Sequence, residues 1–380
     1  MARILVSAGE YSGDLHAARV IRRIKQLAPD VRVSGMGSAQ LRATGADIII
    51  DPTGINSVGL QEAVQNFRTH LAHYRQLKEY VVHFRPRVMF LVDYSGFNMM
   101  MARLGKKKGI PVVHYFAPSA WIWGRWRARW MARMEATIAA VFPGEIDVYR
   151  RAGAEVKFVG HPLLDIVEPV ADEEAVYRQL ELNPGQKVLA LLPGSRDAEV
   201  QKLLPPMLEA AARLQKHDRE LQFVIPLADS INFSAVSDRV GQHRLIARVV
   251  RGSTRKVMQI SDFIISASGT ATLEAAILGT PMLIVYKTSD ITYRLGKKLI
   301  NRRFIGLPNL VADNEVVPEL IQDEVSAADI FKQVNYYLRK PYLLKEMERS
   351  LEQTSDILGE KGAIDRTANL VLEKGAIKSG

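Results

Sequence analysis

The sequence contains no cysteine among its 380 residues. Disulfide bonds, thiolate nucleophiles and thiolate metal sites are therefore excluded. No apolar run approaches the ~18 residues of a membrane-spanning helix. The N-terminus carries only a short apolar core around Ile4, which is less than a signal peptide needs. We therefore expect the protein to stay in the cytoplasm.

Several functional motifs are also missing from the sequence. No spacing of histidine and acidic residues suggests a bound metal. The chain has neither the G-x-x-x-x-G-K-S/T pattern of a P-loop nor the G-x-S-x-G pattern of a nucleophile elbow. Gly35-Met36-Gly37 lacks the third glycine of a dinucleotide-binding fingerprint. We interpret it as a turn between a strand and a helix.

Acidic residues are fewer than basic residues. Lys and Arg number 51 against 41 Asp and Glu, which gives a formal net charge of +10. Nucleic acid, an anionic membrane surface and a phosphorylated substrate all suit this charge. A soluble protein with a basic bias is the plainer alternative. The apolar fraction of 47% and the charged fraction of 24% are ordinary for a globular chain.

Short apolar runs alternate with amphipathic helical stretches along the chain. A first strand is expected at Ile4–Ser7, followed by a helix near Asp14–Leu27. Further strands are expected at Val88–Val92, Val112–Tyr115, Thr137–Phe142, Val188–Leu192, Gln222–Pro226, Phe263–Ser266 and Met282–Val285. Apolar runs spaced by helices indicate parallel sheets that are covered on both faces.

The alternating pattern is interrupted around His161–Asp172 and then restarts. We therefore predict an α/β fold of two Rossmann-like, doubly wound domains that face a cleft. The predicted boundaries are residues 1–165 for the first domain and 166–345 for the second. Residues 346–380 are predicted to form a helical tail that packs on the first domain or on a partner subunit.

Two strand ends in the first half carry candidate functional residues. Ala8–Asp14 opens a helix whose free amides can bind an anion or a sugar hydroxyl; an ordinary turn is the alternative. Asp93 follows an apolar strand, so we expect its carboxylate to project into the cleft and to accept a proton from a hydroxyl. The alternative for Asp93 is a helix N-cap.

Two strand ends in the second half suit a nucleotide. Arg196 lies beside a new helix N-terminus, an arrangement that favours a diphosphate, and an ion pair with Glu199 is the alternative. In Ser266–Glu274, small residues allow a phosphate to approach the backbone. Glu274 lies one turn into the helix and can accept hydrogen bonds from two ribose hydroxyls. Capping alone is the alternative for this segment.

All four tryptophans lie between His114 and Trp130, interleaved with arginines. Such a segment can stack on nucleic acid bases. It can equally lie at a membrane interface. The third interpretation is a helix packed on the core with a solvated arginine face.

Taken together, the motifs resemble those of the lipid-A-disaccharide synthase family. The matching segments occur in order over nearly the whole chain: Ala8–Asp14, Asp93, His114–Trp123, Gly160–Pro162, Leu191–Arg196, Ser268–Glu274 and Leu307–Leu310. The resemblance implies an inverting glycosyltransferase of the GT-B architecture. It implies transfer of 2,3-diacylglucosamine from UDP-2,3-diacylglucosamine to 2,3-diacylglucosamine 1-phosphate, which gives a β-1,6-linked disaccharide 1-phosphate and UDP.

The resemblance also implies where the protein works. The reaction belongs to lipid A biosynthesis in Gram-negative bacteria. The enzyme is expected to be peripheral on the cytoplasmic face of the inner membrane, with an anionic membrane surface as a partner and no nucleic acid. No metal or other cofactor is expected. A homodimer that exchanges C-terminal segments is possible within the family.

The family's functional residues carry over onto matching positions. Asp93 is the implied general base, the first domain binds the acceptor and the lipid, and the second binds the UDP-sugar. The implied UDP-sugar residues are Arg196, Ser268, Gly269, Thr270, Glu274 and Asn309, with the specific role of Asn309 left open. Glu10, Ser12 and Asp14 match the loop that faces the acceptor. Ser7 and Tyr11 depart from the family pattern and bear on the shape of that loop.

The acyl chains require an apolar surface that is bordered by basic residues. We expect it within Ile55–Phe67, at Val58, Leu60, Val64 and Phe67. An ordinary amphipathic helix docked on the core is the alternative.

Two other functions are compatible with parts of the sequence. One is another GT-B enzyme that uses a UDP-sugar, such as a UDP-N-acetylglucosamine 2-epimerase or a peptidoglycan-type glycosyltransferase. The other is a nucleic-acid-binding protein that uses the tryptophan-rich segment.

Overall fold

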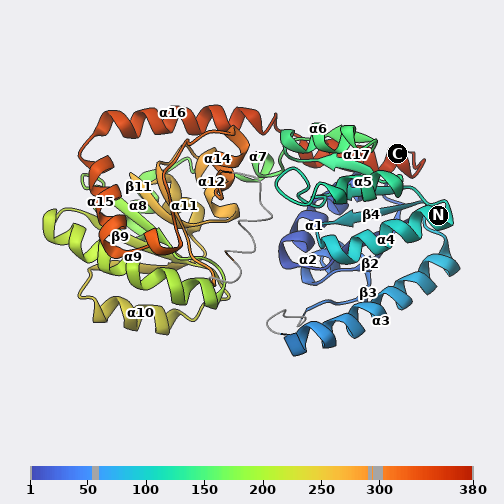
Figure 1. Cartoon of the computed structure of the whole chain (residues 1–380), viewed down its shortest axis with the longest axis horizontal. Coiled ribbons are helices and arrows are strands. Elements are labelled where there is room, and N and C mark those ends of the chain that lie inside the picture. Colours follow the sequence, from blue (N-terminus) through green and yellow to red (C-terminus); the bar gives the residue numbers. More distant parts are fainter. Residues whose placement is uncertain (1, 54–59, 290–292, 294–302, 379–380) are drawn as a thin grey trace. The chain divides into compact units, whose positions relative to one another are not determined.

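The structure is a computed structural model that describes residues 2–53, 60–289, 293 and 303–378, with only the backbone for residues 60–67. The chain divides into two compact units (Figure 1). The first comprises Met1–Asp165 together with Gly359–Gly380, and the second comprises Ile166–Leu358. Within the described residues, no helix has the length and apolar composition needed to cross a membrane.

The first unit is built on a seven-stranded parallel sheet with the order β3-β2-β1-β4-β5-β6-β7. Its strands are β1 (Arg3–Ala8), β2 (Arg32–Met36), β3 (Asp47–Ile50), β4 (Val88–Val92), β5 (Val112–Tyr115), β6 (Thr137–Ala140) and β7 (Val156–Phe158). Its helices are α1 (Tyr11–Leu27), α2 (Ala39–Arg42), α3 (Leu60–Phe84), α4 (Ser95–Lys108), α5 (Trp126–Arg133), α6 (Pro143–Arg151) and α17 (Ala363–Lys374), and α7 (Leu163–Ile166) lies at the unit boundary.

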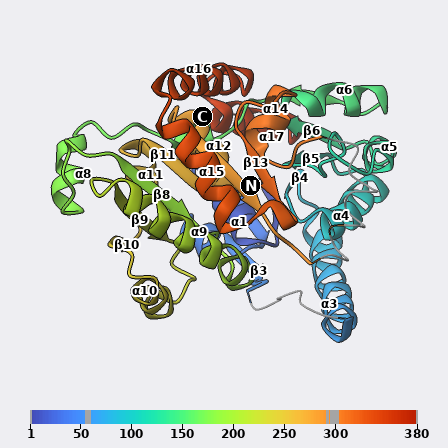
Figure 2. The same cartoon turned by 60° about the vertical axis from the view of Figure 1, so that its left-hand side comes forward.

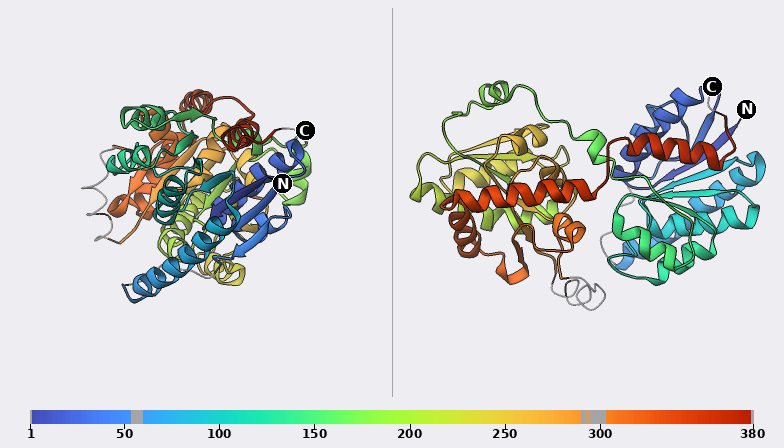
Figure 3. Two further views of the ribbon diagram at one scale, coloured as in Figure 1. Left: turned by 90° about the vertical axis from the view of Figure 1, so that its right-hand side faces the viewer. Right: turned by 90° about the horizontal axis from the view of Figure 1, so that it is seen from above.

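Both faces of this sheet are covered by helices. Successive residues of a strand point to opposite faces, and in these strands the residues on both faces are apolar. Phe90 and Val92 of β4 pack with α1 and α17 on one face, whereas Met89 and Leu91 pack with helices α3 to α6 on the other. The C-terminal helix α17 lies beside α1, as the red and blue helices of the right-hand unit in Figure 3 show (right panel).

The second unit contains a six-stranded parallel sheet with the order β10-β9-β8-β11-β12-β13. Its strands are β8 (Val188–Leu192), β9 (Gln222–Leu227), β10 (Ala247–Arg251), β11 (Phe263–Ala267), β12 (Met282–Tyr286) and β13 (Glu319–Ile321). The helices described in this unit are α8 (Glu173–Gln179), α9 (Asp197–His217), α10 (Phe233–Gln242), α11 (Thr254–Gln259), α12 (Thr270–Ile277), α14 (Leu307–Ala312), α15 (Ala327–Leu338) and α16 (Pro341–Ile357). Helices α9 and α15 lie side by side (Figure 2).

The two parallel sheets with alternating helices confirm the predicted α/β, doubly wound class. In each sheet the strand order reverses beside the first strand of the unit, at β1 and at β8. Ligands of such sheets bind outside the carboxyl ends of the strands at this reversal. The candidate site is therefore sought at the ends of β1 and β4, and of β8 and β11.

The segment predicted as one C-terminal tail consists of two helices in different units. Helix α16 packs on α12 and α14 of the second unit, and α17 packs in the first unit. The turn between them is anchored by Asp165, whose carboxylate accepts hydrogen bonds from the backbone N–H groups of Gly362 (2.5 Å) and Ile364 (2.9 Å).

Candidate active site

The carboxyl ends of β1 and β4 are adjacent, because Ala8 pairs with Val92 in register. The β1–α1 loop and Asp93 therefore lie beside one another. Glu10 of this loop and Ser12 in the first turn of α1 are exposed, and Asp93 is half-buried. Asp93 is held by its backbone N–H, which donates to the carbonyl of Tyr115 at 2.9 Å.

Asp93 and Tyr94 form an unusual turn at the end of β4. Both residues have φ of 50°, in the left-handed region that non-glycine residues disfavour. Such conformations cost on the order of 1–3 kcal/mol each and occur where the surrounding structure enforces them, often at functional sites. The ring of Tyr94 lies against Gly9, where a Cβ atom would be 2.1 Å from Cδ1 of the tyrosine. The Tyr94 hydroxyl also forms a hydrogen bond of 2.6 Å with Nε2 of His70.

The environment of Asp93 makes its carboxylate more basic than that of an exposed aspartate. Burial raises the pKa of its carboxyl group to about 6, and the negative charge of Glu10 contributes in the same direction. The carboxylate is therefore ionised at neutral pH but is more basic than an exposed aspartate. A general base is most effective when its pKa lies near the working pH. The raised pKa could not be predicted from the sequence, which places Asp93 after a strand but does not show which groups surround it.

Asp14 has a structural role, in contrast to the exposed Glu10 and Ser12. Its side chain is buried, with 1% exposure. One carboxylate oxygen accepts from the Ser38 backbone N–H at 2.8 Å, and the other accepts from the Ser38 hydroxyl at 2.7 Å and from the Gln40 N–H at 2.9 Å. Asp14 thus caps α2 and fixes α1 to the end of β2. Its carboxylate is engaged by the protein, not presented to an acceptor.

A row of neutral rings also lies at this edge, and the sequence analysis assigned it no function. The ring of Phe116 is 4.6 Å from that of His16 and 5.8 Å from that of His161, which in turn is 4.9 Å from Phe142. Burial lowers the pKa of His16 to about 4 and that of His161 to about 3. Both imidazoles are therefore uncharged at neutral pH.

The tryptophan-rich segment packs on the core in part, as the third interpretation expects, whereas Trp126 at the start of α5 is 58% exposed. Trp121 is buried against Phe142, and Ala128 and Met131 of α5 are buried. The guanidinium of Arg127 lies 3.5 Å from the ring centroid of Trp123. That face of the indole is therefore already covered and is not open to a nucleic acid base.

The β8–α9 loop of the second unit carries Arg196. The structure contains the ion pair that was the alternative: Nη1 of Arg196 lies 3.1 Å from Oε1 of Glu199. Oε2 of Glu199 accepts from the Ser195 backbone N–H at 3.3 Å, so the glutamate folds over the loop. The Arg196 side chain is nonetheless 76% exposed, which leaves most of its donors open to solvent.

The β11–α12 turn presents small residues at a helix N-terminus. Ser268 is half-buried, and Gly269 and Thr270 are exposed. A Cβ atom at Gly269 would meet no neighbour within 4 Å, so the backbone there is open to a ligand. The first amides of α12 lack partners within the helix, as at any helix N-terminus, and an anion can use them.

Glu274 is positioned by an arginine that the sequence analysis missed. Arg255 of α11 donates from Nε (3.1 Å) and Nη2 (2.6 Å) to the same carboxylate oxygen, Oε1. It also donates from Nη1 to the carbonyl of Ile166 at 3.3 Å. Glu274 is 16% exposed, and neither Arg255 bond uses its Oε2. Arg255 lies 19 residues before Glu274, and no local pattern signals the pair.

Asn309 is saturated by the protein. It is fully buried, its amide nitrogen donates to the carbonyl of Val317 (2.8 Å) and to Glu319 (2.7 Å), and its oxygen accepts from the N–H groups of Val316 and Val317. Glu319 in turn accepts from the N–H groups of Ile305 and Gly306. The Asn309 amide therefore joins α14 to the approach to β13. A direct contact with a UDP-sugar would need atoms that are already engaged.

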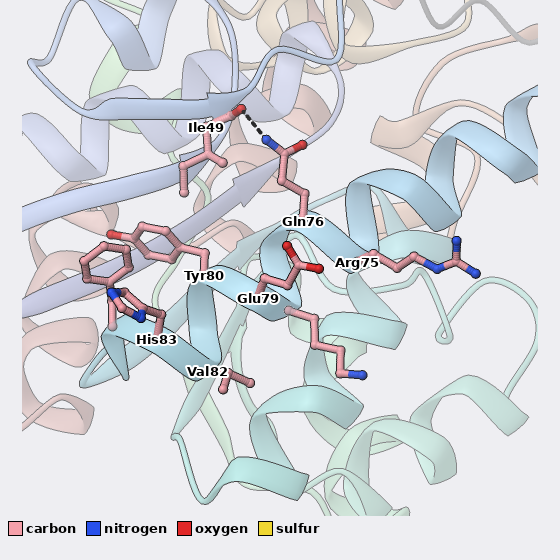
Figure 4. Close-up of a pocket in the computed structure, with 9 residues that line it drawn as sticks. Ile49, Arg75, Gln76, Glu79, Tyr80, Val82 and His83 are labelled. Atoms are coloured by element: carbon pink, nitrogen blue, oxygen red, sulfur yellow. Dashed lines mark hydrogen bonds between the residues drawn. The ribbon is translucent and has the colours of Figure 1, made fainter.

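A groove in the first unit lies away from these strand ends. This groove of about 800 Å³ runs between β3 and the C-terminal half of α3, where Gln76 Nε2 donates to the Ile49 carbonyl at 3.4 Å (Figure 4). Its residue Phe84 lies 4.7 Å below the guanidinium of Arg3, the first residue of β1. This end of the groove is at the amino end of the sheet, opposite Asp93.

Two further points concern the metal and membrane predictions. Among the residues that the structure describes, no cluster of three or more His, Cys, Asp or Glu side chains could hold a metal ion. Val58 lies outside the described residues, and so do the side chains of Leu60, Val64 and Phe67.

Comparison with known proteins gives consistent matches over the whole chain. A family model described as lipid-A-disaccharide synthetase matches residues 4–372. A lipid-A-disaccharide synthase of Geobacter sulfurreducens is 38% identical over 371 residues, which is 98% of this chain and 97% of the relative. One from Myxococcus xanthus is 37% identical over 372 residues, again covering 98% and 97% of the two chains.

Solved structures with the same fold are more distant in sequence. The UDP-GlcNAc 2-epimerase from Neisseria meningitidis, bound to UDP-GlcNAc, matches with a TM-score of 0.66 at 15% identity, covering 98% of this chain and all of the other. A glycosyltransferase from Rickettsia africae matches with a TM-score of 0.59 at 11% identity and covers 98% of both chains. At these identities the likeness concerns the fold alone, two Rossmann-like domains of the GT-B type.

Proposed function

The chain belongs to the lipid-A-disaccharide synthetase family, and from this premise we propose the reaction and the residues that carry it. The protein is a glycosyltransferase of lipid A biosynthesis and uses a UDP-sugar. The proposed donor is UDP-2,3-diacylglucosamine, and the proposed acceptor is 2,3-diacylglucosamine 1-phosphate. The acceptor 6-hydroxyl attacks the anomeric carbon, the bond from that carbon to the diphosphate breaks, and a β-1,6-linked disaccharide 1-phosphate and UDP result.

Asp93 is proposed as the general base, and its geometry is the observation that carries the mechanism. It lies at the carboxyl end of β4 beside the β1–α1 loop, in a strained turn, with the pKa of its carboxyl group raised to about 6. The carboxylate takes the proton of the acceptor 6-hydroxyl as the new bond forms. Proton transfer of this kind contributes about 10²–10⁴ to the rate. Exposed Glu10 and Ser12 are proposed to face the acceptor, while Asp14 holds the loop's shape.

The leaving UDP requires stabilisation of its diphosphate and recognition of its ribose. We assign the diphosphate to the amides at the start of α12, around Ser268, Gly269 and Thr270, and to the exposed guanidinium of Arg196. Preorganised donors of this kind stabilise developing negative charge. Glu274 Oε2 accepts from the ribose hydroxyls, while Arg255 holds Oε1. Asn309 supports the second unit from within and makes no direct contact in this scheme.

The lipid nature of both proposed substrates suggests contact with an anionic membrane surface, at the cytoplasmic face of the inner membrane. The net charge of +10 and the exposed arginine face of α5 support this proposal. The apolar patch at Val58, Leu60, Val64 and Phe67 is the proposed inserting surface. A homodimer that exchanges α17 is also proposed. It is supported by the short link between α16 and α17, which belong to different units.

The reaction is tested by incubating purified protein with both lipid substrates in detergent, with and without EDTA, and measuring products by mass spectrometry. We expect equal amounts of disaccharide 1-phosphate and UDP in both conditions. Tight UDP binding without disaccharide would redirect the assignment to another UDP-sugar reaction. If the protein neither forms the disaccharide nor binds UDP, the proposed function is contradicted.

A further inference from the structure

The side chain of Asn98 is a buried link between the ends of β1 and β4. It lies in the first turn of α4 with 0% exposure. Its amide nitrogen lies 2.7 Å from the Asp93 carbonyl oxygen, 3.1 Å from that of Val92 and 3.2 Å from that of Ser7. Its amide oxygen accepts the hydroxyl hydrogen of Ser7 at 2.7 Å. One amide therefore bridges Ser7 near the end of β1, Val92 at the end of β4 and the turn that follows β4.

Only an amide fits this set of partners. The two amide hydrogens face three carbonyl oxygens, while the amide oxygen faces a hydroxyl donor. An aspartate at this position would place a second acceptor against the three carbonyls. An apolar side chain would leave buried carbonyls without donors, which native structures avoid. Ser7 completes the set, because its hydroxyl supplies the donor that the amide oxygen accepts.

The bond to the Asp93 carbonyl acts on the strained part of the chain. Asp93 and Tyr94 both adopt φ of 50°, a conformation that persists only when its surroundings enforce it. The Asp93 N–H is held by Tyr115 and its carbonyl by Asn98. Gly13 borders the side chain, since a Cβ atom there would be 3.5 Å from Cβ of Asp93. With both peptide groups fixed, the direction of the Cα–Cβ bond of Asp93 is fixed as well.

We propose that Asn98 is a positioning residue for Asp93, and that the Ser7 hydroxyl orients the Asn98 amide. This inference rests on the proposed role of Asp93 as the base. Asn98 touches no reacting atom. It holds the backbone from which the carboxylate is presented, so that the carboxylate meets the acceptor hydroxyl in a single orientation. The link makes the placement of the base depend on the end of β1 as well as on β4.

The test compares Asn98→Ser and Ser7→Ala with wild type in the disaccharide assay. Asn98→Ser is expected to lower kcat by about 10², the effect of a small misplacement of a catalytic group, with KM for the UDP-sugar within about twofold of wild type. Ser7→Ala removes one hydrogen bond and is expected to lower kcat by about two- to tenfold. Ser261→Ala in the second unit is the matched control, because it also removes a buried hydroxyl donor, to the Val257 carbonyl at 2.6 Å, and it is expected to leave kcat unchanged.

A second readout separates positioning from simple loss of folded protein. Carboxyl signals of selectively ¹³C-labelled aspartate are titrated, with that of Asp93 identified by its absence in Asp93→Asn. Release of the turn exposes the carboxylate, so the Asp93 titration is expected to move from about pH 6 towards its ordinary value in Asn98→Ser and to stay in place in Ser261→Ala. Partial unfolding would reduce the signal without moving it.

The outcomes distinguish this inference from the proposed function. If wild type forms no disaccharide, the proposed function fails, and the titration still decides whether Asn98 positions Asp93. If wild type is active but Asn98→Ser keeps both wild-type kcat and the wild-type Asp93 titration, the inference is overturned. Thermal midpoints of the variants are measured alongside, so that only folded protein is compared.

Discussion

The backbone of Asp93 adopts a disfavoured conformation, and its carboxylate adds a second unfavourable contribution at neutral pH. The pKa of this carboxyl group is about 6 in the fold, above its ordinary value of 3.8. A raised pKa means that the fold favours the protonated form. The contribution of the protonated Asp93 carboxyl group to the stability of the fold is therefore fully present at low pH. It is lost as the pH rises from about 4 to about 6 and the group ionises. A residue kept under these conditions is typical of an active site.

Asp93→Asn is accordingly expected to raise the thermal midpoint at pH 7 while abolishing most activity. Asparagine carries no charge to bury and tolerates the left-handed region better than most residues. Differential scanning calorimetry at pH 7 and at pH 4 measures the effect. The gain should be largest at pH 7 and shrink at pH 4, where wild-type Asp93 is protonated. A lower midpoint at pH 7 would contradict this interpretation of Asp93.

Glu10 is expected to set part of the pH dependence of the reaction. Its negative charge raises the pKa of Asp93, so its removal lowers that pKa. In Glu10→Gln, the acidic limb of kcat/KM should therefore move to lower pH than the wild-type limb near pH 6. Glu209→Gln, on an exposed turn of α9, is the control and should leave the limb in place. An unchanged limb in Glu10→Gln would show that this charge does not act on the base.

Arg255 is expected to affect binding of the UDP-sugar more than turnover. Arg255→Met leaves Glu274 without the two bonds to Oε1, so the carboxylate is free to turn away from the ribose. We expect KM for the UDP-sugar to rise about tenfold, with kcat changed much less. Arg178→Met removes a surface ion pair with Glu174 and serves as the control. Equal KM values for the two variants would remove Glu274 from the proposed ribose site.

At the residue scale, the sequence could place functional groups but not decide how each is used. Asp93 and Glu274 were predicted from their positions after apolar strands. Asp14 and Asn309 occur in equally suggestive motifs, yet both are saturated by buried backbone groups. A buried polar group must find partners, and those partners come from segments that a local motif does not contain. For the same reason, Arg255 and the role of Asn98 were not foreseen.

At the scale of elements, the interior strands other than β2 were predictable from their apolar runs, and the edge strands were not. The run Val88–Val92 is apolar throughout and is strand β4 as predicted. Strand β10 reads Ala-Arg-Val-Val-Arg and is only partly buried, because it lies at the edge of its sheet. Strand β2 contains Ser34 and Gly35, which weaken the apolar signal. Strand β6 ends at Ala140, two residues before the predicted limit, as the chain turns into α6.

The Asn309 link is expected to stabilise the second unit as a set of elements. Asn309→Ala leaves the N–H groups of Val316 and Val317 and the carboxylate of Glu319 without this partner. We expect the free energy of unfolding to fall by about 2–4 kcal/mol. The shift of the urea midpoint, followed by circular dichroism, measures the effect. A midpoint within error of wild type would contradict the structural role and restore Asn309 as a candidate ligand of the UDP-sugar.

At the scale of the whole molecule, the net charge of +10 and the proposed lipid substrates predict binding to anionic vesicles. The combined variant Val58→Ser, Leu60→Ser and Phe67→Ser is expected to reduce co-sedimentation with phosphatidylglycerol vesicles by about tenfold or more, because three apolar side chains no longer insert. Ile246→Ser with Ile357→Ser, two exposed apolar residues elsewhere, is the control. Unchanged binding of the triple variant would exclude this patch as the inserting surface.

The restart of the strand–helix pattern after residue 165 predicted the two-unit architecture, and the order of the motifs along the chain predicted the family through their resemblance to it. The tail was predicted to pack on the first domain or on a partner subunit, but the sequence did not show that only its second helix returns to the first unit. Helices α16 and α17 are both amphipathic, and the packing of α17 beside α1, together with the anchoring of residues 362 and 364 by Asp165, assigns the second helix to the first unit.

The measurement that tests the central claim most directly is a time course of both products with wild type and Asp93→Asn. UDP and the disaccharide 1-phosphate are quantified together by mass spectrometry from the two diacylglucosamine substrates. The account predicts equal amounts of the two products from wild type and a rate lower by about 10²–10⁴ in the variant, with UDP still bound. Absence of disaccharide from wild type, or equal rates in the two proteins, would contradict it.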